Sequence, residues 1–136
     1  MGLIYVGIRV TDLERSVKFY TGALGLKERK RGKMSHGGLW VGLIDPVTSV
    51  SLELNWYPPD SPFHSPYTPG EGLDHIGFEV PDAKATIRAV IAAGGELAVA
   101  PWLEDGRYWI GFVKDPDGNW LEIQGLATAT PAAPKT

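Results

Sequence analysis

Apolar residues along this chain follow two periods, a short alternation typical of strands and a longer spacing typical of helices. In the first half, runs rich in leucine, β-branched and aromatic residues predict strands at residues 4–10, 38–44 and 50–56, and a further strand is predicted at residues 26–31. A helix is predicted between the first two runs, with an inner face formed by Leu13, Val17, Tyr20 and Leu24. The first half therefore predicts one strand, one helix and three further strands.

The ends of this helix carry recognisable signals. Thr11 and Glu14 form a capping box, in which the Thr hydroxyl accepts from the backbone N–H of Glu14 and the Glu side chain reaches back. Either Gly22 or Gly25 is expected to end the helix. Asp45, followed by proline, marks the turn between the last two strands.

The second half predicts the same order of elements. Its strands are expected at residues 73–80, 96–100, 108–114 and 120–124. Asp82 is predicted to cap a helix that Gly94 and Gly95 stop, and the inner face of that helix comprises Ile87, Val90 and Ile91. The sequence Asp-Pro-Asp-Gly from Asp115 predicts a tight turn between the last two strands.

The two halves are also similar residue by residue. Tyr5 opens the run Tyr-Val-Gly-Ile-Arg-Val-Thr-Asp, and His75 opens the run His-Ile-Gly-Phe-Glu-Val-Pro-Asp. The sequence Leu-Glu-Leu around Glu53 matches Leu-Glu-Ile around Glu122. The interval from Tyr5 to Glu53 differs by a single residue from that between His75 and Glu122. We therefore predict an α+β fold made of two tandem βαβββ modules.

A proline-rich segment at residues 57–72 separates the two modules. Proline excludes regular structure there, and a connection of this length is usually a linker or a functional lid. The first module is predicted at residues 1–56 and the second at residues 73–125. Residues 126–136 are small and proline-rich and predict a disordered tail. The modules together are expected to form one domain.

Composition narrows the class of protein. The hydrophobic fraction of 43% and charged fraction of 21% are those of a soluble globular protein. The net charge is −3; no basic stripe suggests nucleic acid, and no Lys/Arg cluster suggests an anionic membrane. The absence of cysteine excludes disulfides and thiol catalysis. With no recognisable signal peptide and no apolar run long enough to span a bilayer, a cytoplasmic location is expected.

Three polar residues stand in runs that are otherwise apolar: Glu53, His75 and Glu122. Because strands alternate faces, each Glu could simply point to solvent while its neighbours face the core. Their equivalent places in the repeat favour a second interpretation, in which pseudo-twofold packing of the modules brings all three to one cavity. A Glu/His/Glu set suits Mn, Fe, Co, Ni or Zn and leaves open positions for water or substrate.

Longer segments of the chain, at residues 7–26, 52–54, 73–78 and 112–122, carry a specific pattern that ends in Asp-Pro-Asp-Gly-Asn-Trp-Leu-Glu. In these segments the chain resembles the vicinal oxygen chelate superfamily, which includes glyoxalase I, extradiol dioxygenases, methylmalonyl-CoA epimerase and bleomycin-resistance proteins. The resemblance implies cupped mixed β-sheets around a central cavity. It also implies metal ligands at the places of Tyr5, Glu53, His75 and Glu122.

Tyr5 departs from the family pattern, because glyoxalase I and many relatives have His or Gln there. A phenol with a pKa of about 10 is a poor ligand for most divalent ions near neutral pH. Three interpretations stay open: Tyr5 lines the cavity, donates a hydrogen bond or proton to the substrate, or ligates a hard ion as phenolate. We favour the first two. Two further candidates for substrate binding are Arg9 and His36, whereas His64 is expected in solvent unless its loop closes.

The resemblance favours a metal-dependent lyase or isomerase of glyoxalase type. One divalent ion would hold two adjacent oxygens of a small hydroxycarbonyl or hemithioacetal-like substrate, which reacts through an enediolate. Glu122 or Glu53 would remove the proton alpha to the carbonyl. Nothing local indicates glutathione as the thiol.

Two other functions remain open at this point, a metal-free binding protein of the bleomycin-resistance kind and an iron-dependent ring-cleaving dioxygenase. The retained Glu/His/Glu set argues against the first. The tyrosine argues against the second, whose iron site has two His and one Glu, so that only the places of His75 and Glu122 match. A homodimer is expected, with modules that pair within one chain or swap between two chains.

Overall fold

The computed structural model describes residues 1–35 and 37–127. Contacts between Cα atoms divide the chain into two compact units, Met1–Thr68 and Pro69–Thr136, and the boundary falls within the proline-rich segment. Each unit contains one βαβββ module. No helix in the described part of the chain is long and apolar enough to cross a membrane.

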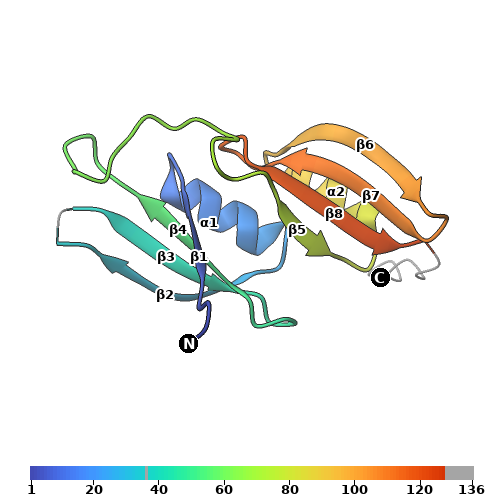
Figure 1. Cartoon of the computed structure of the whole chain (residues 1–136), viewed down its shortest axis with the longest axis horizontal. Coiled ribbons are helices and arrows are strands. Elements are labelled where there is room, and N and C mark those ends of the chain that lie inside the picture. The colour runs from blue at the N-terminus through green and yellow to red at the C-terminus, as the bar shows by residue number, and fades with distance from the viewer. Residues whose placement is uncertain (36, 128–136) are drawn as a thin grey trace. The chain divides into compact units, whose positions relative to one another are not determined.

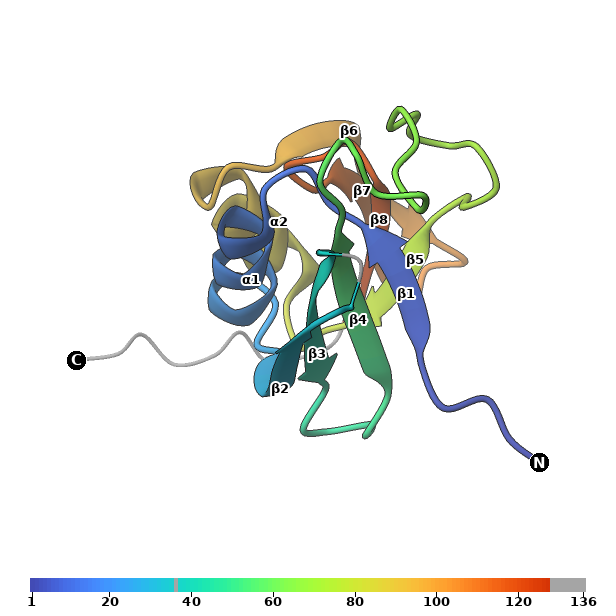
Figure 2. The ribbon, with the colours of Figure 1, turned by 90° about the vertical axis from the view of Figure 1, so that its left-hand side faces the viewer.

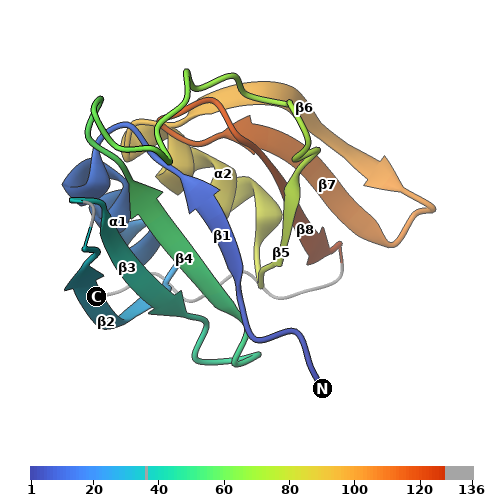
Figure 3. The same ribbon diagram turned by 60° about the vertical axis from the view of Figure 1, so that its left-hand side comes forward.

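The first module has one helix and a four-stranded mixed sheet with the strand order β1-β4-β3-β2 (Figure 3). Strand β1 is parallel to β4, and the other neighbours are antiparallel. Helix α1 packs along one face of this sheet, against β2, β3 and β4 (Figure 1). The elements are β1 (Val6–Arg9), α1 (Leu13–Gly22), β2 (Lys27–Lys33), β3 (Leu39–Ile44) and β4 (Ser51–Trp56).

The second module repeats this arrangement with the strand order β5-β8-β7-β6, and α2 packs against β6, β7 and β8. Its parallel pair is β5 and β8. The elements are β5 (Ile76–Glu79), α2 (Ala83–Ala92), β6 (Glu96–Glu104), β7 (Tyr108–Lys114) and β8 (Trp120–Leu126). Both β6 and β8 run beyond the predicted strands, because each continues its pairing with β7. Residues 128–136 of the predicted tail lie outside the described residues.

Each module has its core between the helix and the facing side of the sheet. Leu52 and Leu54 of β4 are 8% and 0% exposed, and Leu121 and Ile123 of β8 are both 0% exposed. Complete burial of such side chains stabilises the fold by roughly 1.5–3 kcal/mol each. Because successive strand residues point to opposite faces, the glutamates between these pairs face the side of the sheet away from the helix.

Both helices begin at an aspartate, and for the first helix this corrects the predicted capping box. The Asp12 carboxylate accepts from the backbone N–H of Arg15 at 3.1 Å, whereas the Thr11 hydroxyl accepts from the Arg15 guanidinium at 3.0 Å. Thr11 is therefore one residue too early to be the cap. Asp82 caps α2 as predicted, and its carboxylate accepts from the backbone N–H of Ala85 at 3.0 Å.

The helix faces also differ in part from the prediction. Val17 and Tyr20 of α1 are buried as expected, and Phe19 is buried with them. In α2, Ile87 and Val90 are buried, but Ile91 is 43% exposed. Ile91 follows Val90 directly, so its side chain lies about 100° further round a helix with 3.6 residues per turn and leaves the narrow contact with the sheet.

An aspartate organises the last turn of each module. The buried Asp115 carboxylate accepts from the backbone N–H groups of Asp117 and Asn119, at 2.9 and 2.8 Å, and from the Asn119 amide at 2.9 Å. Gly118 has φ 89°, a left-handed conformation that glycine adopts without strain. Asp45 occupies the equivalent place in the first module and accepts from two backbone N–H groups, at 2.7 and 3.2 Å.

We expect Asp115→Ala to lower the free energy of unfolding by about 3 kcal/mol, because buried donors lose a charged acceptor. The matched change Asp45→Ala should cost only about 1 kcal/mol, since its turn is more exposed to water. Urea unfolding of both variants measures the difference. Equal losses of unfolding free energy in the two variants would contradict the expectation that the Asp115 turn stabilises the fold more than the Asp45 turn.

Candidate functional site

The second module places His75 and Glu122 side by side on the sheet face away from α2. His75 directly precedes β5, and Glu122 lies opposite Gly77 in the parallel pairing of β5 with β8. A Cβ atom at Gly77 would lie 3.8 Å from Glu122 Oε2, an ordinary contact distance. The His75 Nε2 and Glu122 Oε2 atoms are 3.3 Å apart.

Asp74 contacts the other nitrogen of the same imidazole. His75 Nδ1 lies 2.6 Å from Asp74 Oδ1. Because an ionised carboxylate can only accept, this bond requires a proton on Nδ1 and leaves Nε2 to face Glu122. The hydrogen bond with Asp74 is the largest cause that raises the pKa of His75, and the charges of Asp74 and Glu122 act in the same direction. A His with its second nitrogen held by a carboxylate is a common arrangement for a metal ligand.

Aromatic side chains surround this pair. Phe112 lies opposite Glu122 in the pairing of β7 with β8, and its ring meets His75 edge-on with centroids 5.5 Å apart. Trp102 stacks on Phe112 at 6.1 Å, and Trp120 lies at a tilt 5.9 Å from Phe112. This aromatic wall makes one side of the His75–Glu122 pair apolar, which strengthens electrostatic interactions next to it.

In the first module, Tyr5 and Glu53 line one hollow of about 220 Å³, here called the Glu53 hollow. Glu53 pairs with Gly7 on β1 and with Gly42 on β3, so neither of its paired residues places a side chain over it. Burial raises the pKa of Glu53, against a smaller opposite effect of a hydrogen bond with Asn55. The Glu53 hollow therefore holds a partly buried carboxylate beside a phenol.

Trp40 forms another wall of the Glu53 hollow. A Cβ atom at Gly32 on β2 would lie only 2.7–2.9 Å from the Trp40 indole, so the indole lies against this glycine. Glycine is required here by the close approach of the ring, because any larger residue would push the indole away.

The donor set fits a divalent ion in chemistry but is divided between the modules. Within the described residues, no group of three or more His, Asp or Glu side chains stands ready to hold a metal. The second module contributes an imidazole nitrogen and a carboxylate 3.3 Å apart, a separation that two ligands of one ion can adopt. The first module contributes the Glu53 carboxylate, in a hollow open to further ligands.

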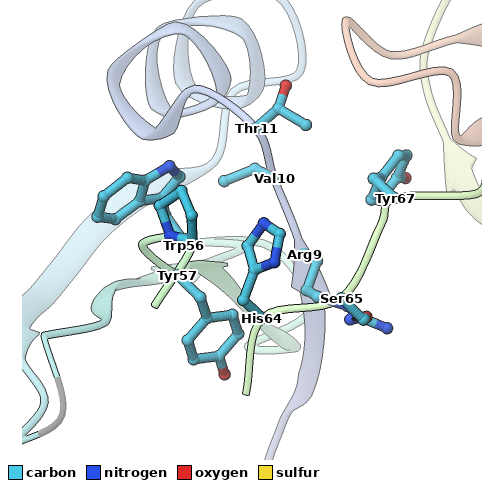
Figure 4. Close-up of a pocket in the computed structure, with 9 residues that line it drawn as sticks. Arg9, Val10, Thr11, Trp56, Tyr57, His64, Ser65 and Tyr67 are labelled. Atoms are coloured by element: carbon cyan, nitrogen blue, oxygen red, sulfur yellow. Dashed lines mark hydrogen bonds between the residues drawn. The ribbon is translucent and has the colours of Figure 1, made fainter. Parts of the chain in front are cut away.

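The proline-rich segment returns toward the end of β1 (Figure 2). A second hollow of the first module lies there (Figure 4). Arg9 donates from its guanidinium to the Ser65 hydroxyl. His64 lies in the same hollow with Trp56 and Tyr57, and Tyr57 stacks on Phe63 with centroids 5.8 Å apart. The sequence left open whether His64 is solvated or lies in a lid; it contributes to the wall of this hollow.

The predicted site residues thus fall into three groups. His75 and Glu122 meet in the second module, Tyr5 and Glu53 share the Glu53 hollow in the first, and Arg9 lines the separate hollow at Ser65. His36 lies outside the described residues.

Sequence reasoning missed several residues that line these sites: Asp74, Phe112, Trp40, Arg29 and Lys30. Asp74 could have been found, since it directly precedes the predicted ligand His75 in the sequence. The others depend on pairing between strands, which the sequence pattern does not reveal.

The chain belongs to the glyoxalase/bleomycin resistance protein/dioxygenase superfamily, whose family model matches residues 2–123. Among named relatives, it is 33% identical over 129 residues to a lactoylglutathione lyase of Haemophilus influenzae, covering 90% of this chain and 91% of the relative. It is 35% identical over 129 residues to a lactoylglutathione lyase of Neisseria meningitidis, covering 90% and 89%.

Longer proteins match as well. A probable chloroplastic lactoylglutathione lyase of Arabidopsis thaliana is 35% identical over 127 residues, which is 89% of this chain but 35% of the plant protein. Solved structures agree on the predicted βαβββ fold. A glyoxalase family protein from Bacillus cereus superposes with a TM-score of 0.78 at 16% identity, covering 91% of this chain and 93% of that one. A glyoxalase I mutant from Zea mays gives 0.73 at 26% identity, with 89% and 46% covered.

The contacts of His75 lead to a prediction about its titration. In Asp74→Asn the neutral amide replaces the carboxylate that favours the protonated imidazole, so the pKa of His75 should fall. Glu122→Gln should lower this pKa by less, because Glu122 is the smaller cause. NMR titration of the His75 ring protons measures both values. A larger fall of the His75 pKa in Glu122→Gln than in Asp74→Asn would contradict the assignment of Asp74 as the main cause of the raised pKa.

Proposed function

We propose that this protein is a metal-dependent lyase or isomerase of glyoxalase I type. Its substrate would be a small hydroxycarbonyl or hemithioacetal-like compound that reacts through an enediolate. The observation that carries this proposal is the His75–Glu122 pair beside the aromatic wall. Relatives at 33–35% identity that are named lactoylglutathione lyases support the reaction class.

The residues proposed to hold the ion are Glu53, His75 and Glu122, whether the modules that supply them belong to one chain or to two. Carboxylate and neutral imidazole are suitable ligands for Zn, Ni, Mn, Co or Fe. A bound divalent ion would supply Lewis-acid stabilisation of the negative charge that develops on the two substrate oxygens. The bond with Asp74 would hold the His75 ring in the orientation that turns Nε2 toward the ion.

A carboxylate of this chain would move the proton. Glu122 or Glu53 would accept it from the carbon alpha to the carbonyl and return it to the adjacent carbon, which isomerises the substrate without any net redox change. The raised pKa of Glu53 suits this role, since a more basic carboxylate is a better acceptor. The aromatic wall would exclude water from the Glu122 side of the reaction.

Tyr5 is proposed as a hydrogen-bond donor to the substrate and not as a ligand. Its phenol lines the Glu53 hollow, and a phenolic O–H can donate a hydrogen bond to a substrate oxygen. A homodimer is also proposed, and the cytoplasmic location stays a prediction.

Protein purified without chelators or a His tag should contain one divalent ion per chain by elemental analysis. Glu122→Gln should lose most of this metal, because an amide is a weaker ligand than a carboxylate. Glu96→Gln is the matched control, since Glu96 is an exposed carboxylate on β6, which β7 separates from the strand of Glu122, and it should keep its metal. Metal affinity should fall as pH drops through the raised pKa of His75, because only neutral imidazole binds.

The outcome separates the candidate functions. Turnover of the hemithioacetal of methylglyoxal that disappears with chelation and returns with metal would support the lyase. No metal in the purified protein, and no uptake of added Zn, Ni, Mn, Co or Fe, would refute the proposed site. A metal-free binding protein would then be the better explanation of the hollows.

A further inference from the structure

Strand β2 concentrates the positive charge of the first module. Five of its seven residues are basic, in the sequence Lys-Glu-Arg-Lys-Arg-Gly-Lys from Lys27 to Lys33. This corrects the interpretation of the sequence as one without a Lys/Arg cluster. The overall charge of −3 conceals this cluster, because carboxylates elsewhere outnumber it.

Within this strand the basic residues have different surroundings. Arg31 is held by two carboxylates, with its guanidinium 2.5 Å from Glu14 of α1 and in direct contact with Glu28. Arg29 and Lys30 line the Glu53 hollow instead. In the described part of the chain, neither of these two makes an ion pair with a carboxylate. Their charges are therefore available to a ligand.

A β-bulge explains how two consecutive residues reach the same hollow. Glu28 pairs with Leu43 and Lys30 pairs with Gly42, so Arg29 is an extra residue without its own partner on β3. In a regular strand, neighbours point to opposite faces, whereas a bulge redirects a side chain and is common next to functional sites. The bulge thus presents a guanidinium and an ammonium to one hollow.

The second module has the same bulge, with Ala98 as the extra residue between Leu97 and Val99, but it has no cations there. In the first module, the row across the sheet is Lys30, Gly42 and Glu53. In the second module, the residues at the same places are Val99, Phe112 and Glu122. In the first module, a glycine lies between the cation and the carboxylate, so no side chain separates them. In the second module, a phenylalanine lies between a valine and the carboxylate. Shared topology does not require this difference.

Charges on an edge strand have a simpler explanation, since they prevent sheets from pairing edge to edge. Lys27 and Lys33 satisfy that explanation, because both are exposed on β2 and neither lines the Glu53 hollow. It does not account for the presence of Arg29 and Lys30 in the lining of the Glu53 hollow, since the bulge itself is common to both modules. If the charges only protect the edge, loss of Arg29 and Lys30 should affect ligand binding no more than loss of Lys27 and Lys33. If they bind a ligand, loss of Arg29 and Lys30 should weaken binding more.

We propose that Arg29 and Lys30 bind an oxyanion of the substrate, a carboxylate or a phosphate, in the Glu53 hollow, with Tyr5 as a further donor. This proposal rests on the proposed function, because it takes the bound oxyanion to be part of the substrate. Guanidinium binds such groups through two parallel hydrogen bonds, ammonium adds a point charge, and the phenol adds one neutral hydrogen bond. These three donors would offset the repulsion between the bound anion and the nearby Glu53 carboxylate.

The first test measures binding of inorganic phosphate to the full chain by NMR, with the Gly42 amide and the Trp40 indole as reporters in the hollow. We expect a saturable shift of both signals. Arg29→Gln/Lys30→Gln should weaken phosphate binding at least tenfold. Lys27→Gln/Lys33→Gln removes the same charge from the same strand outside the hollow, and it should change binding less than twofold. Tyr5→Phe should weaken binding about three- to tenfold, the effect of one lost hydrogen bond.

No saturable shift, or equal weakening in the two double variants, would overturn the proposal in favour of general surface charge. The far-UV spectrum of each variant shows whether the sheet is intact. Because this readout needs neither turnover nor metal, it separates the two proposals. Specific phosphate binding without any lyase activity would refute the proposed function and leave an oxyanion site.

The second test identifies the part of the substrate that carries the oxyanion. Three hemithioacetals are compared: methylglyoxal with 2-mercaptoethanol, which is neutral; methylglyoxal with 3-mercaptopropionate; and a phosphorylated 2-oxoaldehyde with 2-mercaptoethanol. Arg29→Gln/Lys30→Gln should lower kcat/KM at least tenfold more for the anionic compound that fits than for the neutral one. Turnover that falls equally for all three, or for none, would overturn the proposal while leaving the lyase function intact.

Discussion

The alternation of side chains along β4 and β8 is the constraint on which the site depends. Leu52 and Leu54, like Leu121 and Ile123, must face the helix of their module, because they supply much of its core. Glu53 and Glu122 are then forced onto the opposite face. A shift by one residue would bury each carboxylate under the helix, at a cost of several kcal/mol, and expose two core residues.

The parallel pairing with β1 and β5 completes each half of the candidate site. It sets a glycine opposite each glutamate, Gly7 in the first module and Gly77 in the second. Tyr5 and His75 directly precede these two strands. A pair that can bind a metal thus follows from register and needs no special loop. Loops add the second layer, such as Asp74, which contacts the imidazole from just outside β5.

The order of elements, both modules and the positions of the glutamates follow from local patterns, and the sequence predicts them well. The fold is confirmed by its superposition on glyoxalase family structures. Features that depend on pairing between strands were not predictable in the same way. The bulge at Arg29 and the position of Phe112 opposite Glu122 arise from register between segments whose sequences show no sign of it. The cap at Asp12 was missed because Thr11 and Glu14 have the spacing of a capping box.

The two modules share a backbone plan but differ in the side chains around their carboxylates. Phe112 and Trp102 give the second module an apolar wall beside its imidazole and carboxylate. The open Gly42 and the cations of β2 give the first module a polar hollow suited to holding charge. The proposed oxyanion site therefore draws on the first module alone, whereas the proposed metal site draws on both modules. Duplication makes this possible, because side chains in one copy can change while the other copy keeps its part of the site.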